Sequence, residues 1–175
     1  MPAAGRGALQ APISRIVSGG QTGVDRAALD FARANGLPYG GWCPQGGWAE
    51  DHERPPGLLR RYPMLRETPS TDPARRTAWN VRDSDATLIL FRPGVTSPGT
   101  EASARHAAEL SRSVRTVDVL DPDAPAAVRG LITSRADPQV LNVAGPRESE
   151  APGIYREARA LLDRALSDLL SPPPE

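Results

Sequence analysis

Residues 13–26 read ISRIVSGGQTGVDR, and this stretch decides the fold class of the chain. Its first five residues form a short apolar run that is typical of a buried strand. A helix is expected to start at Thr22 or Gly23, because Val24 is followed by apolar residues three, four, seven and eight positions later. Asn35-Gly36 supplies the stop signal of that helix. The stretch therefore predicts a strand, a glycine-rich loop and a helix in direct succession.

The loop between this strand and helix has the composition of an anion-binding site. Glycine permits a tight turn and a close approach of the backbone to a ligand, and the first N–H groups of a helix have no partner within it. A plain tight turn is the alternative interpretation. If the loop binds a phosphate group, its binding residues are Gly19, Gly20, Gln21, Thr22, Gly23 and Arg26.

Two common phosphate-binding motifs do not fit this loop. The dinucleotide fingerprint G-x-G-x-x-G would need a glycine where Ser18 stands, and an acidic residue about twenty positions on, where residues 40–44 read GGWCP. All 21 basic residues are arginines. The absence of lysine excludes a Walker A loop and a pyridoxal Schiff base on this chain.

Length and composition favour one globular domain. The chain has 175 residues, of which 39% are hydrophobic and 24% charged, enough for a core that folds alone. We expect a single domain over residues 13–170, with disordered ends at residues 1–12 and 171–175, which are rich in Pro, Ala and Gly.

Charge and hydropathy limit the partners and the compartment. The 21 acidic residues balance the arginines, which are scattered along the chain, so duplex nucleic acid is not an expected partner. The sequence contains no long apolar stretch and no signal-peptide pattern, so we expect no membrane partner and a cytoplasmic location. The single Cys43 fits a reducing compartment.

Strands and helices are expected to alternate along the whole chain. After residues 13–17, strands are predicted at 39–43, 62–65, 86–91, 115–120 and 140–144, and helices at 73–81, 99–112, 125–134 and 152–170. A loop at 44–57, rich in Pro and Gly, is a candidate lid or binding loop outside the core. This alternation predicts an α/β fold, a Rossmann-like three-layer sandwich with a mainly parallel sheet and helices on both faces.

Three loops follow predicted strands at their carboxyl ends, where ligands bind in sheets of this kind. They span residues 18–26, 92–100 and 144–149, and each contains glycine. The second adds the hydroxyl groups of Ser97 and Thr100 beside Gly99, and the third adds Gly145 and the cationic fork of Arg147. We expect the three loops to line one pocket for a phosphate-bearing ligand.

Four motifs in a fixed order resemble the putative molybdenum carrier family. They are GGQTGVDRAALD at 19–30, GWCP at 41–44, WNVRDSD at 79–85 and LNVAGPRES at 141–149. That family is similar in fold to the algal molybdenum cofactor carrier and to the lysine decarboxylase-like proteins of the SLOG superfamily. The resemblance implies a homo-oligomer, a dimer or tetramer, that holds molybdenum cofactor (molybdopterin) or a nucleotide.

An enzyme is the alternative function. Phosphoribohydrolases, which release a base from a nucleoside monophosphate, carry the signature P-G-G-x-G-T-x-x-E, and residues 93–103 read PGVTSPGTEAS. Gly99-Thr100 match, but Ser103 stands in the glutamate position and Glu101 lies two residues earlier, on another side of the helix. Nucleotide N-glycosidase activity would therefore depend on an altered carboxylate.

Other reactive side chains give weaker signals. Cys43, His52 and His106 match no metal-ligand spacing, so no metal site is predicted. The tryptophans at positions 42, 48 and 79 could stack on a flat ring or pack in the core.

Overall fold

The computed structural model describes residues 11–170 of the chain. The predicted disorder of the two ends falls outside this range, apart from positions 11 and 12. The carbonyl of Pro12 accepts a hydrogen bond of 3.1 Å from the backbone of Gln139, so ordered pairing begins just before the first strand.

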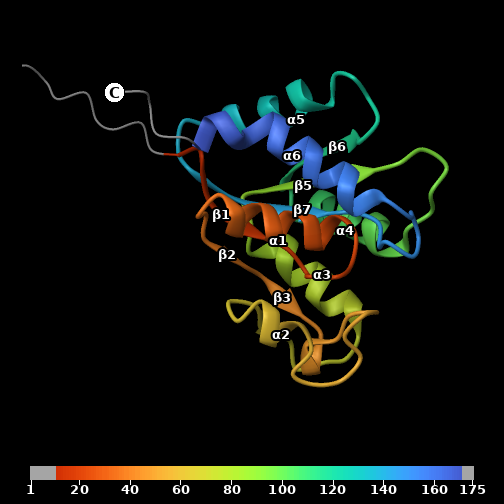
Figure 1. Cartoon of the computed structure of the whole chain (residues 1–175). Helices are drawn as coiled ribbons and strands as arrows, with labels where there is room; N and C mark the ends of the chain where they lie inside the picture. Colours follow the sequence, from red (N-terminus) through yellow and green to blue (C-terminus); the bar gives the residue numbers. More distant parts are fainter. Residues whose placement is uncertain (1–10, 171–175) are drawn as a thin grey trace, which may run out of the picture.

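A five-stranded sheet forms the centre of the molecule, and each pair of neighbouring strands is parallel (Figure 1). Its strands, in spatial order, are β2 (Tyr39–Gly40), β1 (Ile13–Val17), β7 (Gln139–Ala144), β5 (Ala86–Phe91) and β6 (Ser113–Asp118). β5 carries no charged side chain and its first five residues are buried, as expected of a strand covered on both faces.

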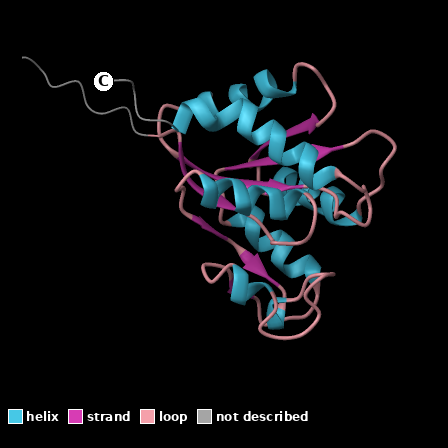
Figure 2. Ribbon diagram, viewed as in Figure 1, coloured by secondary structure: helices cyan, strands magenta, loops and turns pink. Residues whose placement is uncertain are grey.

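Helices cover both faces of the sheet (Figures 1 and 2). On one face α6 (Ile154–Leu170) packs against α1 (Val24–Ala34) and α5 (Ala124–Thr133). On the other, α3 (Pro73–Arg82) packs against α4 (Pro98–Glu109). The predicted α/β fold is confirmed: the chain is a Rossmann-like sandwich of helices, sheet and helices.

The two faces of the sheet differ in polarity. The main apolar core joins Leu88 and Leu141 of the sheet to side chains of α1, α5 and α6 such as Phe31. The next residues along the same strands, Ile89 and Asn142, point the other way because side chains alternate along a strand. On that α3 and α4 face, Asn142 donates a 3.3 Å hydrogen bond to Thr87. Buried polar groups therefore lie on the face that α3 and α4 cover.

A second, smaller unit lies beside the main sheet. β3 (Trp42–Cys43) pairs in parallel with β4 (Arg66–Glu67), and between them come a 3-10 turn (Gln45–Gly47) and α2 (Leu58–Arg61). Its buried cluster, which reaches α1 through Leu29, consists of Leu29, Cys43, Ala49, Leu58, Tyr62 and Leu65.

This unit corrects two predictions. The predicted strand at 62–65 is wrong: Tyr62 and Leu65 are buried, but they follow α2, and strand pairing occurs only at Arg66–Glu67. The loop at 44–57 also contributes to a core, because Ala49 is fully buried. The apolar residues that predicted a strand here pack in a local cluster instead.

The predicted strand at 39–43 is divided in two. Gly41 stands between β2 and β3 with φ +125°, and a Cβ there would lie 2.3 Å from the carbonyl oxygen of Ser18. Only glycine allows the backbone to pass so close to Ser18. At this position the chain turns from the main sheet to the small one. The other predicted elements occur close to their expected places; the strand expected at 115–120 runs from Ser113 to Asp118.

The order of connections creates a crevice between β1 and β5. From β1 the chain runs through α1 to β2 at one edge, whereas from β5 it runs through α4 to β6 at the other. Right-handed crossovers then place α1 and α4 on opposite faces, and β7 lies between the two strands. This is the topological switch point where open α/β sheets bind ligands.

Candidate functional site

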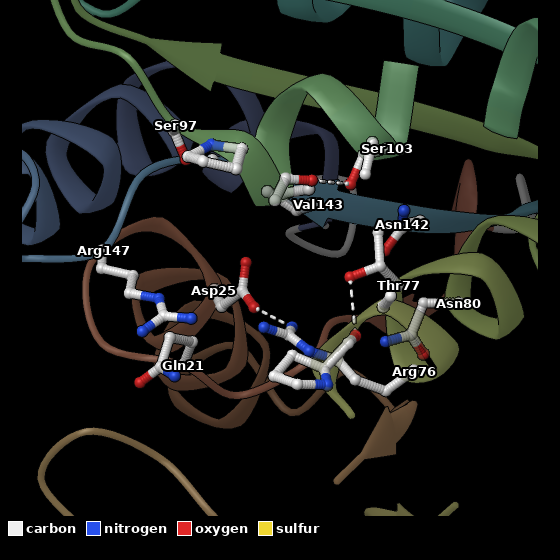
Figure 3. Close-up of a pocket in the computed structure, with 18 of the residues that line it drawn as sticks. Gln21, Asp25, Arg76, Thr77, Asn80, Ser97, Ser103, Asn142, Val143 and Arg147 are labelled. Atoms are coloured by element: carbon white, nitrogen blue, oxygen red, sulfur yellow. Dashed lines mark hydrogen bonds and ion pairs between the residues drawn. The ribbon is translucent and has the colours of Figure 1, made fainter. Parts of the chain in front are cut away.

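A cavity of about 360 Å³ lies at the carboxyl ends of β1, β7 and β5 (Figure 3). All three predicted loops border it. Six of the predicted site residues line it: Gly19, Gln21, Ser97, Gly99, Gly145 and Arg147. Five others do not, and each of these has another environment: Gly20, Thr22, Gly23, Arg26 and Thr100.

Arg76 of α3, which was not among the predicted residues, covers the first loop. Its Nη1 atom lies 2.8 Å from the carboxylate of Asp25, and both side chains are largely buried. A Cβ on Gly19 would lie 1.6 Å from the same Nη1 atom. Gly19 is therefore needed for the close approach of the guanidinium. Burial raises the pKa of Asp25, and the guanidinium beside it opposes that rise.

Gly20 and Gly23 hold the first loop in place without facing the cavity. Gly20 has φ +75°, and a Cβ there would meet Leu58 and Leu65 of the small apolar cluster at 3.0 and 3.1 Å. Gly23 has φ +79°, and its Cβ would lie 2.3 Å from the carbonyl oxygen of Pro146. That carbonyl accepts the N–H of Val24 at 3.2 Å, so the third loop fills part of the helix N-terminus.

The segment 48–52 closes the outer side of the first loop. Arg26 donates to both carboxylate oxygens of Asp51, at 2.8 and 2.9 Å, and to the carbonyl of Gly20 at 3.1 Å. Thr22 donates to the carboxylate of Glu50. These two predicted anion-binding side chains are therefore engaged with carboxylates of the protein.

Glu50 also joins the segment 48–52 to the third loop. Its carboxylate accepts a hydrogen bond of 2.6 Å from the Ser149 hydroxyl. Although burial raises the pKa of Glu50, the hydrogen bonds from Ser149 and Thr22 outweigh it and the pKa falls below its ordinary value. The pKa of Asp51 is lowered chiefly by the hydrogen bond from Arg26.

The second loop leaves the N-terminus of α4 facing the cavity. Ser97 occupies the N-cap position without a capping hydrogen bond, and its hydroxyl donates to Glu150 at 2.9 Å. Thr100 donates to the Ser97 hydroxyl at 2.8 Å. A Cβ on Gly99 would meet no atom within 4 Å. Open space therefore adjoins the first turn of a helix of 12 residues.

The third loop is tied to both neighbours. Gly145 is required by close packing, since a Cβ there would lie 2.4 Å from the Leu90 carbonyl oxygen. The backbone N–H of Arg147 donates to Glu150 at 2.9 Å, and its guanidinium lies 5.6 Å from the centre of the Trp48 ring. The Arg147 side chain lines the cavity. It interacts electrostatically with the Glu50 carboxylate, but no carboxylate of residues 11–170 lies within ion-pair distance of it.

Polar side chains from α3, α4 and β7 line the inner wall of the cavity. Asn80 uses both amide atoms on the backbone of Trp42, at 2.7 and 3.0 Å. Thr77, Ser103 and Asn142 also line the wall. None of these was among the predicted site residues. Asn80 and Asn142 lie within the motifs at 79–85 and 141–149, whereas Thr77 lies in no motif.

The carboxylates that reach the cavity are Asp25 and Glu150. Glu101, the altered carboxylate considered for an N-glycosidase, is exposed and does not line it, whereas Ser103 is 3% exposed and does. Among the described residues, these two are therefore available to a reaction in this cavity that needs a carboxylate.

The remaining candidate side chains have local partners. Cys43 is buried, and desolvation raises the pKa of its thiol to about 11. Trp42 and Trp79 pack edge to face, with ring centroids 4.7 Å apart. Within residues 11–170 no group of three or more His, Cys, Asp or Glu side chains could hold a metal ion. Nor does the described part of the chain contain a helix long and apolar enough to span a membrane.

The sheet order and the cavity at its switch point define the molecule as a Rossmann-like α/β protein. Residues 16–166 match the model of the circularly permutated YpsA family of the SLOG superfamily, cpYpsA. The chain belongs to that family.

A crystal structure of a putative molybdenum carrier protein from Syntrophus aciditrophicus SB is similar to this chain. The two share 39% sequence identity over 89% of this chain and 96% of that one, with a TM-score of 0.77. The resemblance inferred from the four sequence motifs is therefore confirmed. No curated protein matches the chain.

Proposed function

We propose that this protein binds a phosphate-bearing small molecule in the cavity at the switch point. The observation that carries the proposal is the convergence of three loops from β1, β5 and β7 on a single cavity of about 360 Å³. A volume of this size lies at the lower end of the range for small-molecule sites.

The phosphate belongs at the N-terminus of α4. The first N–H groups of a helix are natural donors to an anion, and the open space beside Gly99 leaves room for one. Arg105 of α4 and Arg147 of the third loop line the same cavity, and neither forms an ion pair with an acidic residue of the described chain. Two cationic forks and a helix N-terminus are suited to a terminal phosphate, and they outweigh the carboxylate of Glu150, which is already engaged by Ser97 and the backbone of Arg147.

Molybdenum cofactor and nucleotides are the two proposed ligands. Each joins a phosphate to a flat heterocycle with polar edges, and the inner wall offers Thr77, Ser103 and Asn142 to such edges. The similar protein from Syntrophus aciditrophicus is described as a putative molybdenum carrier. Since residues 11–170 contain no metal-binding cluster, molybdenum would be carried here by the dithiolene of the pterin.

Ligand content and affinity test the proposal. Native mass spectrometry of the purified protein should detect a bound pterin or nucleotide, and calorimetry should show binding of adenosine monophosphate. Arg105→Ala and Arg147→Ala should each weaken that binding by about tenfold, because each removes a charge-assisted contact to phosphate.

Arg164→Ala serves as the matched control, because Arg164 is exposed on α6 and does not line the cavity. The proposal is abandoned if the protein retains no such compound and binds neither a nucleotide nor a pterin phosphate. If Arg105→Ala, Arg147→Ala and Arg164→Ala all bind adenosine monophosphate with equal affinity, the phosphate does not bind at α4.

A nucleotide N-glycosidase is the second candidate, because two carboxylates, Asp25 and Glu150, line the cavity. Release of free base from nucleoside monophosphates, measured by chromatography, distinguishes an enzyme from a carrier. If the protein is an enzyme, Glu150→Gln should abolish release while leaving nucleotide binding intact.

The proposed carrier is a cytoplasmic homo-oligomer, a dimer or tetramer, whose partner is the small molecule itself. Sedimentation velocity measures the number of subunits directly, and a monomer at all concentrations would remove the oligomer from the proposal.

A further inference from the structure

The side-chain amide of Gln21 is held in one orientation inside the cavity. Its oxygen accepts two backbone hydrogen bonds, from Thr22 at 3.1 Å and from Glu50 at 2.9 Å. Only the amide oxygen can accept from N–H groups, so the Nε2 group faces the opposite way. The residue is 3% exposed and lines the cavity, and no atom of residues 11–170 accepts a hydrogen bond from Nε2. Gln21 therefore presents an unpaired donor to the cavity.

Arg76 is a second donor without enough acceptors. Its Nη1 atom is bonded to Asp25 at 2.8 Å, whereas its Nε atom is buried and has no partner in the described part of the chain. A buried donor without an acceptor destabilises the protein that contains it. The Nη2 group of Arg76 forms no hydrogen bond within residues 11–170 and can donate to a ligand, since the side chain lines the same cavity as Gln21 (Figure 3).

Asp25 provides an acceptor at the same place. Its carboxylate lies between the Arg76 guanidinium and the first loop, and it lines the cavity. Two carboxylate oxygens offer about four acceptor positions, of which the Arg76 bond uses one and the backbone N–H of Gln21 another. The side of the cavity formed by the first loop thus combines two donors with one acceptor, and the charges of Asp25 and Arg76 cancel.

We propose that this subsite recognises a lactam, a ring carbonyl beside a ring N–H, in the heterocycle of the bound ligand. The carbonyl accepts from Gln21 and Arg76, and the ring N–H donates to Asp25. This inference rests on the proposed function, which places the phosphate of the same ligand at α4. It favours ligands with guanine-like, hypoxanthine-like or pterin rings over ligands with adenine, which has no ring carbonyl and should bind more weakly.

A second phosphate fits this subsite less well than a lactam. The buried carboxylate of Asp25 would repel a dianion, and the cations near it, Arg76 and Arg26, are already paired with carboxylates. The unpaired arginines, Arg105 and Arg147, belong instead to α4 and the third loop. A neutral group with one acceptor and one donor satisfies all three side chains.

Inosine and adenosine monophosphates test the inference, because they differ only where a lactam replaces an amino-substituted ring edge. Calorimetry on the full chain should show that inosine monophosphate binds at least about tenfold more tightly than adenosine monophosphate. One net hydrogen bond changes affinity by about tenfold. A pterin monophosphate should bind as tightly as inosine monophosphate.

Gln21→Met should reduce the preference for inosine monophosphate to about threefold or less, because the methionine side chain fills similar space without donating. Affinity for adenosine monophosphate should fall by less than affinity for inosine monophosphate. Gln45→Met is the control, because Gln45 is exposed and lies outside the cavity. Circular dichroism of each variant confirms that it is folded, and Gln21→Leu replaces the methionine variant if that one fails to fold.

Two failures are distinguishable. If both nucleotides bind with equal affinity, or if Gln21→Met keeps the preference, the lactam subsite is refuted and the proposed function stands. If neither nucleotide nor the pterin phosphate binds, the proposed function is refuted and the subsite with it.

Discussion

The β1–α1 loop and the β5–α4 loop both lead from a strand of one sheet into a helix beside one cavity. Around the first loop, protein groups occupy the space that an anion would need: Arg76 lies on Gly19, and the Pro146 carbonyl accepts the first helical N–H. Around the second, a Cβ on Gly99 would meet nothing. Glycine in the first loop serves the packing of the protein, whereas glycine in the second leaves room for a ligand.

This difference teaches that a glycine-rich loop before a helix has two physical uses. Glycine lets a backbone approach whatever lies opposite, and that partner can belong to the same chain. The loop that resembles a phosphate site most closely in sequence is the more completely filled of the two. In the proposed binding mode, the phosphate of the ligand binds at α4, and the edge of its ring binds to Gln21, Asp25 and Arg76.

The largest effect is expected from glycine substitutions in the two loops. Gly23→Ala forces a side chain into a φ of +79° and to 2.3 Å from the Pro146 oxygen, so it should lower the free energy of unfolding by about 3 kcal/mol or more. Gly99→Ala should change it by less than about 1 kcal/mol, and should weaken adenosine monophosphate binding. Urea denaturation and calorimetry measure the two quantities.

The contrast between the loops fails if Gly99→Ala proves as destabilising as Gly23→Ala. The contrast also fails if the Gly23 variant is stable and loses only ligand affinity, because that result would indicate that the phosphate binds at the first loop.

A smaller effect is expected when the buried pair at the first loop is broken. Arg76→Met leaves the Asp25 carboxylate buried without its cation, which should cost about 3 kcal/mol of stability at neutral pH. Arg75→Met is the matched control, because the neighbouring arginine is exposed on the same helix.

The cost of Arg76→Met should depend on pH in a definite direction. Burial already raises the pKa of Asp25 above 3.8, and removing the guanidinium raises it further. A raised carboxyl pKa means that the folded state holds its proton more firmly than the unfolded state, so stability falls as pH rises above 3.8 towards the folded value. The loss relative to wild type should therefore be greater at pH 7 than at pH 4. A loss independent of pH would show that Arg76 acts through packing alone.

Much of the fold could be predicted because its signals are local. Apolar periodicity identified α1 and α6, and the uncharged run at Ala86–Phe91 identified β5. The convergence of the three loops followed from one topological rule about strand ends. The small unit did not follow, because Tyr62 and Leu65 pack against residues as distant as Leu29, and no local pattern shows that.

The candidate site was less predictable for the same reason. Arg76 stands 51 positions from Asp25 in the sequence, outside every motif, and only the packing of α3 brings them together. Arg26 and Thr22 stood in a motif, yet carboxylates at Asp51 and Glu50 engage them. Ion pairing with remote residues decides which polar side chains remain available to a ligand.

The smallest effect concerns the segment 48–52, which covers the first loop. The folded state lowers the pKa of Glu50 and Asp51 below 4.5 and 3.8, so their contribution is complete above those values and is lost as pH falls through the folded pKa values. Hydrogen–deuterium exchange within residues 48–52 should therefore gain an acid-dependent component below about pH 4. Exchange in α4 should gain none.

Glu50→Gln should remove much of that pH dependence, since the amide no longer changes charge and keeps one acceptor for Ser149 and Thr22. Glu53→Gln is the control, because Glu53 is exposed nearby. If the acid response survives in the Glu50 variant, Asp51 and Arg26 alone fasten the segment, and the third loop takes no part in closing the first. If it disappears, one carboxylate joins both loops, and ligand contacts at Arg147 become sensitive to the state of Glu50.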